Sequence, residues 1–318
     1  MTSPTPSVLV TGGSGFLGRR LIPALEKSGA QVIAPPSSDC DLTRPGALRS
    51  FLNGAGHGET KFEAVYHLAA WTRAGGFCRR HGGEQWLVHQ AMDGQVLRFW
   101  SEQQPQARLV TFGTSVAYAP SLDAHLESHY LAGEPKADYF GYAMSKRALF
   151  AGARSLAEQY DLSYLHLVPS TLYGPEYHLD GRPLHFIYDL MRKIVRGRRF
   201  GDSVVLWGDG RQRRELVYVD DAVAWILALA SDPKAQGLIN LGAGMDHSIR
   251  EFAGHLCELT GFPFEEIGFD TDAFVGARAK LLGTERLDEI LPDRAMTDLR
   301  QGLARSLEWV EQNLDRLG

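Results

Sequence analysis

Hydrophobic and polar positions follow two alternating patterns over the first half of the chain. Short apolar runs rich in β-branched residues predict buried strands, and stretches with helical spacing follow them. The predicted strands are residues 7–11, 30–35, 62–70, 107–115 and part of 161–175. The clearest helical patterns are residues 19–29 and 140–160. Strands that alternate with helices predict an α/β fold, a doubly wound parallel (Rossmann) sheet covered on both faces.

This alternation changes after residue 175. Residues 176–197 predict a polar loop and a helix, and residues 203–230 predict strand, turn, strand and helix. From about 245 helical segments follow without a regular strand–helix repeat, and no linker separates them. We therefore predict two parts. Residues 1–175 form a cofactor-binding domain, to which a later segment of about 215–242 returns. Residues 176–318 form mainly a smaller α/β lobe that binds substrate.

Composition narrows the class of protein. The 318 residues are 44% hydrophobic, enough for a large core, and the net charge of −5 gives no reason to expect nucleic-acid binding. No apolar run approaches the length of a membrane span, and the N-terminus lacks the basic start and apolar core of a signal peptide. Cys40, Cys78 and Cys257 show neither a pairing pattern nor metal-ligand spacing. We expect a reduced, cytoplasmic protein without a metal.

A glycine-rich turn joins the first predicted strand to the first predicted helix. In TGGSGFLG (residues 11–18), the glycines suit a tight turn, close approach of a pyrophosphate and close helix–sheet packing. The pyrophosphate would lie at the helix N-terminus, where N–H groups point outward. A flexible turn is the alternative, but the strand–loop–helix context favours a dinucleotide site. Its predicted contacts are Gly12, Ser14, Gly15, Phe16, Leu17 and Gly18.

The end of the second predicted strand bears on which dinucleotide binds. An NAD site usually has an acidic residue there, but residues 34–36 are Ala-Pro-Pro. No carboxylate would repel a ribose phosphate, so NADP(H) is favoured; no arginine stands there either, so NAD remains the alternative. The motif HLAA (67–70) would pass behind the cofactor, and residues 41–42 suit its adenine end. The further predicted contacts are Ser37, Asp41, Leu42, Leu68, Ala69 and Ala70.

A tyrosine and a lysine one helical turn apart suggest proton transfer. Thr114 and Ser115 end a predicted strand, Tyr142 begins a helix, and Lys146 lies on the same face. Beside a nicotinamide, the lysine would lower the tyrosine pKa, and the tyrosine would exchange a proton with a carbonyl oxygen as hydride moves. Without such a site, both would be ordinary residues of an amphipathic helix.

Together these motifs resemble the extended short-chain dehydrogenase/reductases of the NAD-dependent epimerase/dehydratase family, over nearly the whole chain. The shared marks are TGGSGFLG, HLAA, Thr114, YAMSK (142–146) and YGP (173–175). Within the family the chain is similar to the GDP-L-fucose synthase group. The marks of that group are AGG (74–76), STLYGP (170–175), HFIYDLMRKI (185–194) and LWGDGRQRRELVYVDD (206–221). This resemblance implies epimerisation of GDP-4-keto-6-deoxymannose at two carbons beside its ketone, and NADPH reduction of that ketone.

The resemblance also implies roles for particular residues. Thr114, Tyr142 and Lys146 fall on the catalytic hydroxyl residue, tyrosine and lysine, and His185 falls on the acid of the epimerisations. Ser115, Lys193, Trp207 and Arg214 fall at or near substrate-binding positions, and the Arg214 guanidinium suits a diphosphate. A homodimer formed through the helix at 140–160 and its neighbour is implied as well. His185 as a helix cap and Trp207 as a core residue are the alternatives.

One residue departs from the group. Its epimerisation base is a cysteine in the motif SSC, but the matching triplet here is Thr114-Ser115-Val116, and valine cannot abstract a proton. The enzyme would then only reduce the ketone, use another base such as Cys78 or His185, or act on a different sugar nucleotide. We expect NADP(H)-dependent reduction at C4. A 4-epimerase with tightly bound NAD is the main alternative, and a non-catalytic cofactor-binding sensor is the other.

Overall fold

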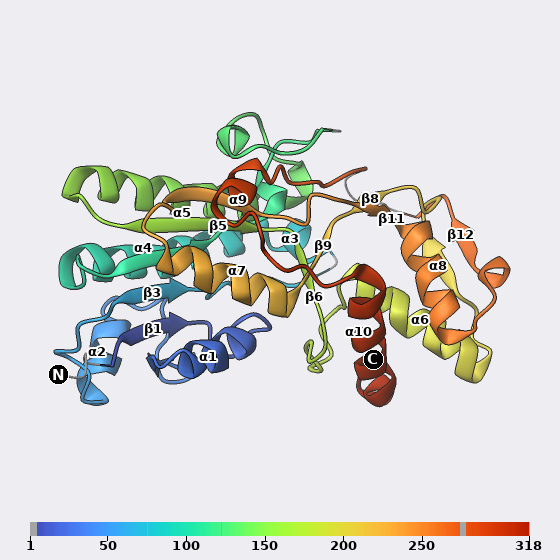
Figure 1. Cartoon of the computed structure of the whole chain (residues 1–318), viewed down its shortest axis with the longest axis horizontal. Helices are drawn as coiled ribbons and strands as arrows, with labels where there is room; N and C mark the ends of the chain where they lie inside the picture. Colours follow the sequence, from blue (N-terminus) through green and yellow to red (C-terminus); the bar gives the residue numbers. More distant parts are fainter. Residues whose placement is uncertain (1–4, 75, 122, 274–277, 318) are drawn as a thin grey trace.

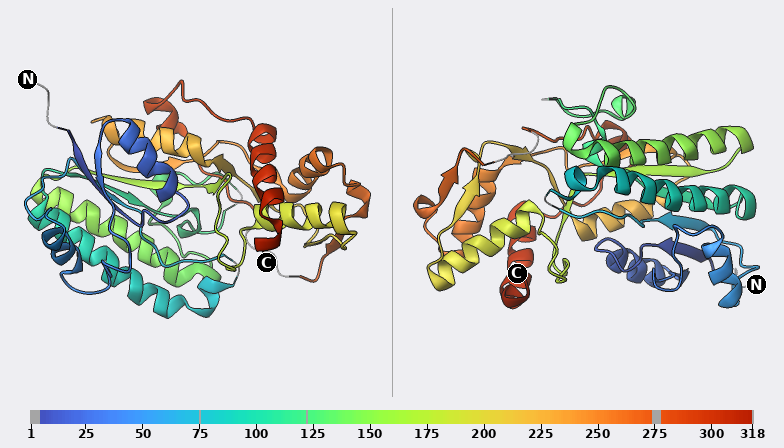
Figure 2. Two further views of the ribbon diagram at one scale, coloured as in Figure 1. Left: turned by 90° about the horizontal axis from the view of Figure 1, so that it is seen from below. Right: turned by 180° about the vertical axis from the view of Figure 1, so that it is seen from behind.

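The computed structural model describes residues 5–74, 76–121, 123–273 and 278–317. It has a large sheet-containing part and a smaller lobe of α6, α8 and α10 with short strands at the opposite end (Figures 1 and 2). The first described residues lie beside the sheet, and the last described residues lie in the lobe (Figure 1).

A six-stranded parallel sheet forms the centre of the larger part. Its order is β10-β5-β4-β3-β1-β2, so the direction in which strands are added reverses at β1. Ligands of open α/β sheets bind at such a switch point, beyond the carboxyl ends of the strands. The doubly wound fold is therefore confirmed. The strands are β1 (Ser7–Thr11), β2 (Gln31–Ile33), β3 (Ala64–His67), β4 (Arg108–Phe112), β5 (Tyr164–Pro169) and β10 (Gly237–Leu241).

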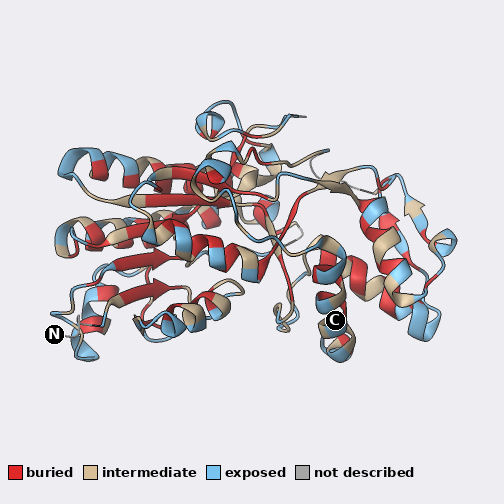
Figure 3. Ribbon diagram, in the orientation of Figure 1, coloured by how far each residue is buried: buried red, intermediate tan, exposed pale blue. Residues whose placement is uncertain are grey.

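Helices cover both faces of this sheet. One face packs against α1 and α7, and the other packs against α2, α4 and α5 (Figure 1). The strands between them are almost entirely buried (Figure 3). The helices of this part are α1 (Gly18–Lys27), α2 (Ala47–Gly54), α3 (Phe77–Arg80), α4 (Gly82–Gln103), α5 (Phe140–Tyr160), α7 (Val219–Ser231) and α9 (Glu285–Ile290).

The lobe has its own apolar core, to which residues 173–218 and 249–317 contribute. Residues 219–241 lie between these segments and pack on the sheet as α7 and β10. The lobe helices are α6 (Phe186–Phe200), α8 (Ile249–Thr260) and α10 (Leu299–Gln312). The remaining strands pair two by two: β6 (Thr171–Tyr173) with β9 (Leu216–Tyr218), β7 (Val205–Trp207) with β12 (Gly268–Asp270), and β8 (Arg213–Arg214) with β11 (His247–Ser248).

The structure corrects several predicted elements. The strands predicted at 30–35, 62–70 and 107–115 are shorter, because their carboxyl-end residues turn into loops above the sheet. The helix predicted to end at Gly29 ends at Lys27. Helix α4 was not predicted at all. Its buried face includes Gln85, His89 and Asp93, and these polar residues interrupt the apolar period.

The carboxylate of Glu215 joins segments that are distant in sequence. Its Oε1 accepts hydrogen bonds from the backbone N–H groups of Ala243 (2.7 Å) and Gly244 (2.9 Å), and Oε2 accepts one from Leu282 (3.1 Å). The side chain is buried, and a buried carboxylate needs such partners. Glu215 therefore fixes the segment around Leu282 against the carboxyl end of β10.

Replacing Glu215 by glutamine should destabilise the protein. Glutamine has an amide nitrogen in place of one carboxylate oxygen, and this nitrogen would face a backbone N–H group. Neither of these two donors would then have an acceptor, which lowers the free energy of unfolding by about 1–3 kcal/mol. Urea denaturation followed by circular dichroism measures this loss. Glu26→Gln, on an exposed position of α1, is the matched control and should change the free energy of unfolding little. Equal stability of both variants would contradict the role given to Glu215.

Candidate active site

The loops after β1 and β3 touch at the switch point. Gly12 has φ +74°, and a Cβ there would lie 2.6 Å from the backbone nitrogen of Ala69. A Cβ on Gly18 would lie 2.5 Å from the oxygen of Gly13, so α1 can begin directly beneath the turn. At Gly15 a Cβ would meet only the oxygen of Gly12, at 3.2 Å, which leaves the outer side of this turn open. This cradle at the N-terminus of a ten-residue helix fits a dinucleotide pyrophosphate.

The other predicted cofactor contacts surround this cradle. Ser14 and Ser37 are exposed. The Leu68 N–H donates a hydrogen bond to the backbone oxygen of Thr11 (3.1 Å). No charged side chain occurs at residues 34–36. The Asp41 carboxylate accepts from Thr43 N–H and Oγ1, and the Leu42 side chain packs in the core with 8% exposure. Leu42 can therefore meet an adenine only through its backbone. Ala69 and Ala70 continue the loop after β3, beside Gly12.

Aromatic contacts connect the glycine turn to the lobe. The Phe16 ring meets Tyr177 edge-on (5.4 Å between centroids), Tyr177 stacks on Tyr188 (4.0 Å), and Tyr188 meets Trp309 (6.3 Å). Arg19 of α1 also donates to the backbone oxygen of Glu176. Leu17 packs toward the core between the sheet, α1 and α7. The turn thus contacts both parts of the molecule.

Thr114 and Tyr142 come together as the sequence predicts. Thr114 follows β4, and its Oγ1 accepts from Val116 N–H (3.4 Å) to cap the short 3-10 turn Ser115–Ala117. Tyr142 lies in the first turn of α5, and the side chains of Thr114 and Thr72 are close enough to its hydroxyl to lower its pKa. Thr72 lies in the loop after β3, so loops after two neighbouring strands hold one phenol.

Tyr142 is a protonated phenol at neutral pH. Burial raises its pKa well above the usual value, the nearby Cys78 and Asp93 raise it further, and the bonds from Thr114 and Thr72 offset this only in part. Lys146 is not among the main causes of this shift, and its predicted effect on the Tyr142 pKa stays a prediction. Lys146 is itself 2% exposed, and burial lowers its pKa against the opposing effect of Asp93.

Buried polar residues of α4 line the back of the site. His67 at the end of β3 bonds to Thr11 Oγ1 (2.7 Å) and to Asp93 Oδ1 (2.9 Å). His89 packs its ring 5.4 Å from that of Tyr142, and burial lowers the pKa of His89 to about 4. The sequence analysis missed His89 and Asp93, for which only their place in an otherwise apolar helical segment is a signal.

A second cluster contains Lys280, Arg214 and Tyr139. The Lys280 Nζ lies 5.1 Å from the centre of the Tyr139 ring, and the charge of Arg214 acts on Lys280. Burial first, then repulsion by Arg214 and Lys136, lowers the pKa of Lys280 to about 7. Because Cys78 acts on both Lys280 and Tyr142, the cluster extends to the reacting phenol. Lys280 lies in a segment where the sequence offers no motif.

His185 and Cys78 are both poor bases here. Burial, followed by Lys280 and Arg214, lowers the pKa of His185 to about 3, so its imidazole is neutral, and its buried Nδ1 has no hydrogen-bond partner among the described residues. His185 also stands at the N-cap of α6, but its side chain does not cap the helix. Burial raises the pKa of the Cys78 thiol. Val116 lies where a base was expected.

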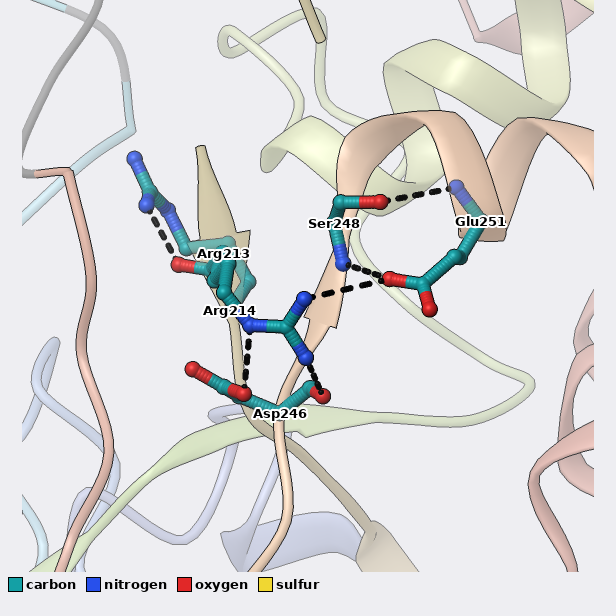
Figure 4. Close-up of polar contacts among 5 residues, drawn as sticks. All are labelled: Arg213, Arg214, Asp246, Ser248 and Glu251. Carbon is teal, nitrogen blue, oxygen red and sulfur yellow. Dashed lines mark hydrogen bonds and ion pairs between the residues drawn. The ribbon is translucent and has the colours of Figure 1, made fainter. Parts of the chain in front are cut away.

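Successive arginines of β8 point to opposite sides (Figure 4). Arg213 pairs with Asp246 (2.7 Å) and with Glu251 (3.4 Å), next to the capping box that Ser248 and Glu251 form. The Arg214 guanidinium turns the other way, where it lines the lobe cavity and acts on Lys280 and His185. The two arginines therefore have different environments, and only Arg214 joins the site.

A cavity of about 650 Å³ opens in the lobe. Three predicted substrate residues, Lys193, Trp207 and Arg214, line it, and Lys193 lies 5.9 Å above the Trp207 ring. Trp207 is 61% exposed, so it is not a core residue. Tyr142 does not line this cavity. Arg214 lines it, and Lys280, which does not, interacts with the charge of Arg214. Gly75 of the AGG motif is outside the described residues.

Neither a metal site nor a membrane-spanning helix occurs among the described residues. No group of three or more His, Cys, Asp or Glu side chains there could hold a metal ion. No helix in the same ranges combines the length and apolar character that crossing a membrane requires.

Comparison with known proteins extends this picture. The model of the NAD dependent epimerase/dehydratase family matches residues 8–242. A GDP-L-fucose synthase of Sinorhizobium fredii is 28% identical, covering 96% of each chain, and a GDP-L-colitose synthase of Yersinia pseudotuberculosis is 26% identical over 97% of this chain and 99% of its own. The crystal structure of a GDP-L-fucose synthetase from Naegleria fowleri bound to NADP superposes with a TM-score of 0.83 at 20% identity, covering 99% of this chain and 96% of its own.

The family model spans well over half of the chain, and the relatives span nearly all of it. The resemblance drawn from the sequence motifs is thus confirmed. This protein belongs to the NAD dependent epimerase/dehydratase family and is an enzyme of its extended short-chain dehydrogenase/reductase type.

Proposed function

We propose that the enzyme uses NADPH to reduce the C4 ketone of a GDP-linked 4-keto-6-deoxy sugar. The observation that carries this proposal is the Tyr142 phenol, which lies close to the side chains of Thr114 and Thr72 in the loops that follow β4 and β3. When bound, NADPH supplies the hydride. Tyr142 donates the proton to the oxygen that becomes a hydroxyl, and Thr114 holds that oxygen in place. Lys146, one turn along α5, supplies positive charge beside this phenol.

The cradle of Gly12, Gly15 and Gly18 would hold the cofactor pyrophosphate. The absence of an acid at residues 34–36 supports NADP(H) over NAD, and so does the related NADP-bound structure. The names of the relatives support a GDP-linked sugar. Arg214 and Lys280 would bind the diphosphate, because Arg214 lines the lobe cavity and Lys280 is close enough to interact with its charge.

The state of Tyr142 also bears on the main alternative. A 4-epimerase begins by oxidising its substrate, which requires a tyrosinate that accepts a proton. A phenol whose pKa is raised by burial is better suited to donate. A cofactor-binding sensor would not need Thr114, Tyr142 and Lys146 together, so we favour the reductase over both alternatives.

We further propose that reduction occurs without epimerisation at C3 or C5. Abstraction of a proton beside a ketone needs a base with a suitable pKa within reach. Val116 supplies none, the Cys78 thiol is held protonated by burial, and His185 binds protons too weakly.

The homodimer stays a prediction. Leu149, Phe150, Ala153 and Ala157 of α5 are buried within this chain, so the apolar stripe of that helix is largely used in its own fold. The exposed Leu87 of α4 and Phe140 of α5 remain available for a partner.

Incubation in deuterium oxide with GDP-4-keto-6-deoxymannose and NADPH tests the reaction. We expect nicotinamide oxidation, followed at 340 nm, and a product without deuterium at C3 or C5 by mass spectrometry. Deuterium at either carbon would show that another base replaces the family cysteine, and the Cys78→Ser and His185→Asn variants would then identify it. Failure to oxidise NADPH with this and other GDP-linked 4-keto sugars would refute the proposed reaction.

Removal of one oxygen tests the proton donor. Tyr142→Phe should reduce kcat at least ~100-fold, because no other group then donates a proton to the ketone oxygen. NADPH affinity, measured by fluorescence titration, should change less than about threefold. Tyr160→Phe, at the exposed end of the same helix, is the control and should retain full activity. Near-normal turnover in Tyr142→Phe would exclude it as the donor.

Lys280 should make substrate binding depend on pH. Its pKa of about 7 means that the cation is lost as the pH rises through neutrality. We expect KM for the nucleotide sugar to rise between pH 6 and 8.5, and Lys280→Ala to have a KM roughly tenfold higher at pH 6. Lys280→Arg keeps its charge over this range, so its KM should vary less. An identical pH profile in wild type and Lys280→Arg would show that another group titrates.

A further inference from the structure

The lobe cavity is strongly basic but contains one carboxylate. Of the described residues that line it, Asp189 is the only acid. The basic residues of the lining are Arg182, Arg192, Lys193, Arg214 and Arg316. Cations in such numbers suit a diphosphate, but an acid among them would weaken that binding. Asp189 therefore calls for a separate explanation.

Asp189 is oriented by two of these cations. It lies in the first turn of α6, where Arg192 donates to Oδ1 (2.8 Å) and Lys193 Nζ lies 3.0 Å from Oδ2. These contacts fix the plane of the carboxylate. Each carboxylate oxygen can accept more than one hydrogen bond, and a third of the side chain is exposed. A ligand in the cavity can thus still find two adjacent acceptors.

Two adjacent acceptors match one common nucleobase. Guanine presents the N1–H and the N2 amino group side by side, so a carboxylate can accept from both. Uracil and thymine present a single N–H between two carbonyl oxygens, which a carboxylate would repel, and hypoxanthine lacks the amino group. Trp207 lines the same cavity and offers an exposed aromatic face on which a base can stack.

We propose that Asp189 is the residue that selects guanine as the base of the nucleotide sugar. This inference rests on the proposed function in one respect, that the nucleotide of the substrate occupies the lobe cavity. The Asp189 carboxylate accepts from guanine N1–H and N2–H, and Lys193 and Arg192 hold it in the orientation for both bonds. A binding site that accepts a hydrogen bond from its ligand discriminates strongly against an analogue without that donor. The acceptor in the site is then left unpaired.

The test compares the binding of GDP, IDP and dTDP by isothermal titration calorimetry. IDP differs from GDP only by the missing amino group, so it isolates one hydrogen bond to a charged acceptor. We expect wild type to bind GDP at least ~10-fold more tightly than IDP or dTDP. Asp189→Asn, which keeps the shape and removes one acceptor, should bind GDP and IDP within about threefold of each other. Asp180→Asn, an acid that pairs with Arg182 but does not line the cavity, should keep the wild-type ratio.

Each outcome decides the proposal. If Asp189 only neutralises its cations, Asn at this position should change the affinity for all three nucleotides together, with the GDP to IDP ratio preserved, and the proposal is wrong. Wild type that binds GDP and IDP equally overturns it as well, whatever the variant does. The proposed reaction can fail separately, since selective GDP binding without NADPH oxidation would refute the reductase and leave the role of Asp189 intact.

Discussion

The active site depends on one buried carboxylate, that of Glu215. Removing a carboxylate from water is costly, and three backbone N–H groups from two distant segments compensate Glu215. The residue before it is Arg214, and the segment that its Oε2 holds at Leu282 carries Lys280. Glu215 thus links the strand that carries Arg214 to the segment that carries Lys280, which are distant in sequence.

These cations are held together against their mutual repulsion. Arg214 lowers the pKa of Lys280, and both lower that of His185. When Lys280 is protonated, below its pKa of about 7, the fold thus keeps two positive charges close together before any ligand binds. With the proposed function, this arrangement suits the diphosphate of the substrate.

The parts of the site that local sequence patterns encode could be predicted. The glycine spacing is a local motif that marks a tight turn before a helix, and Tyr142 and Lys146 share a helical face, so both could be recognised from neighbouring residues alone. Helix α4 could not be recognised, since its buried Gln85, His89 and Asp93 serve the site and interrupt the apolar pattern. Lys280 could not be found either. Its position comes from bonds of its neighbours Leu281 and Gly283 with His125, and of Leu282 with Glu215, which are all long-range. The protonation state of Tyr142 could not be predicted from the sequence either. Burial raises its pKa more than the nearby hydroxyl groups of Thr114 and Thr72 lower it.

The aromatic contacts from Phe16 through Tyr177 and Tyr188 to Trp309 have a mechanical consequence. They begin in the glycine turn after β1 and end in the core of the lobe. If the cofactor and the sugar bind as proposed, stacked, rigid rings thus limit the spacing between the two parts that hold them. Little translational freedom remains to be lost when the ternary complex reaches its reactive geometry. A conservative change at Tyr177, which meets neither the ketone nor the hydride, would then slow the reaction by loosening this alignment.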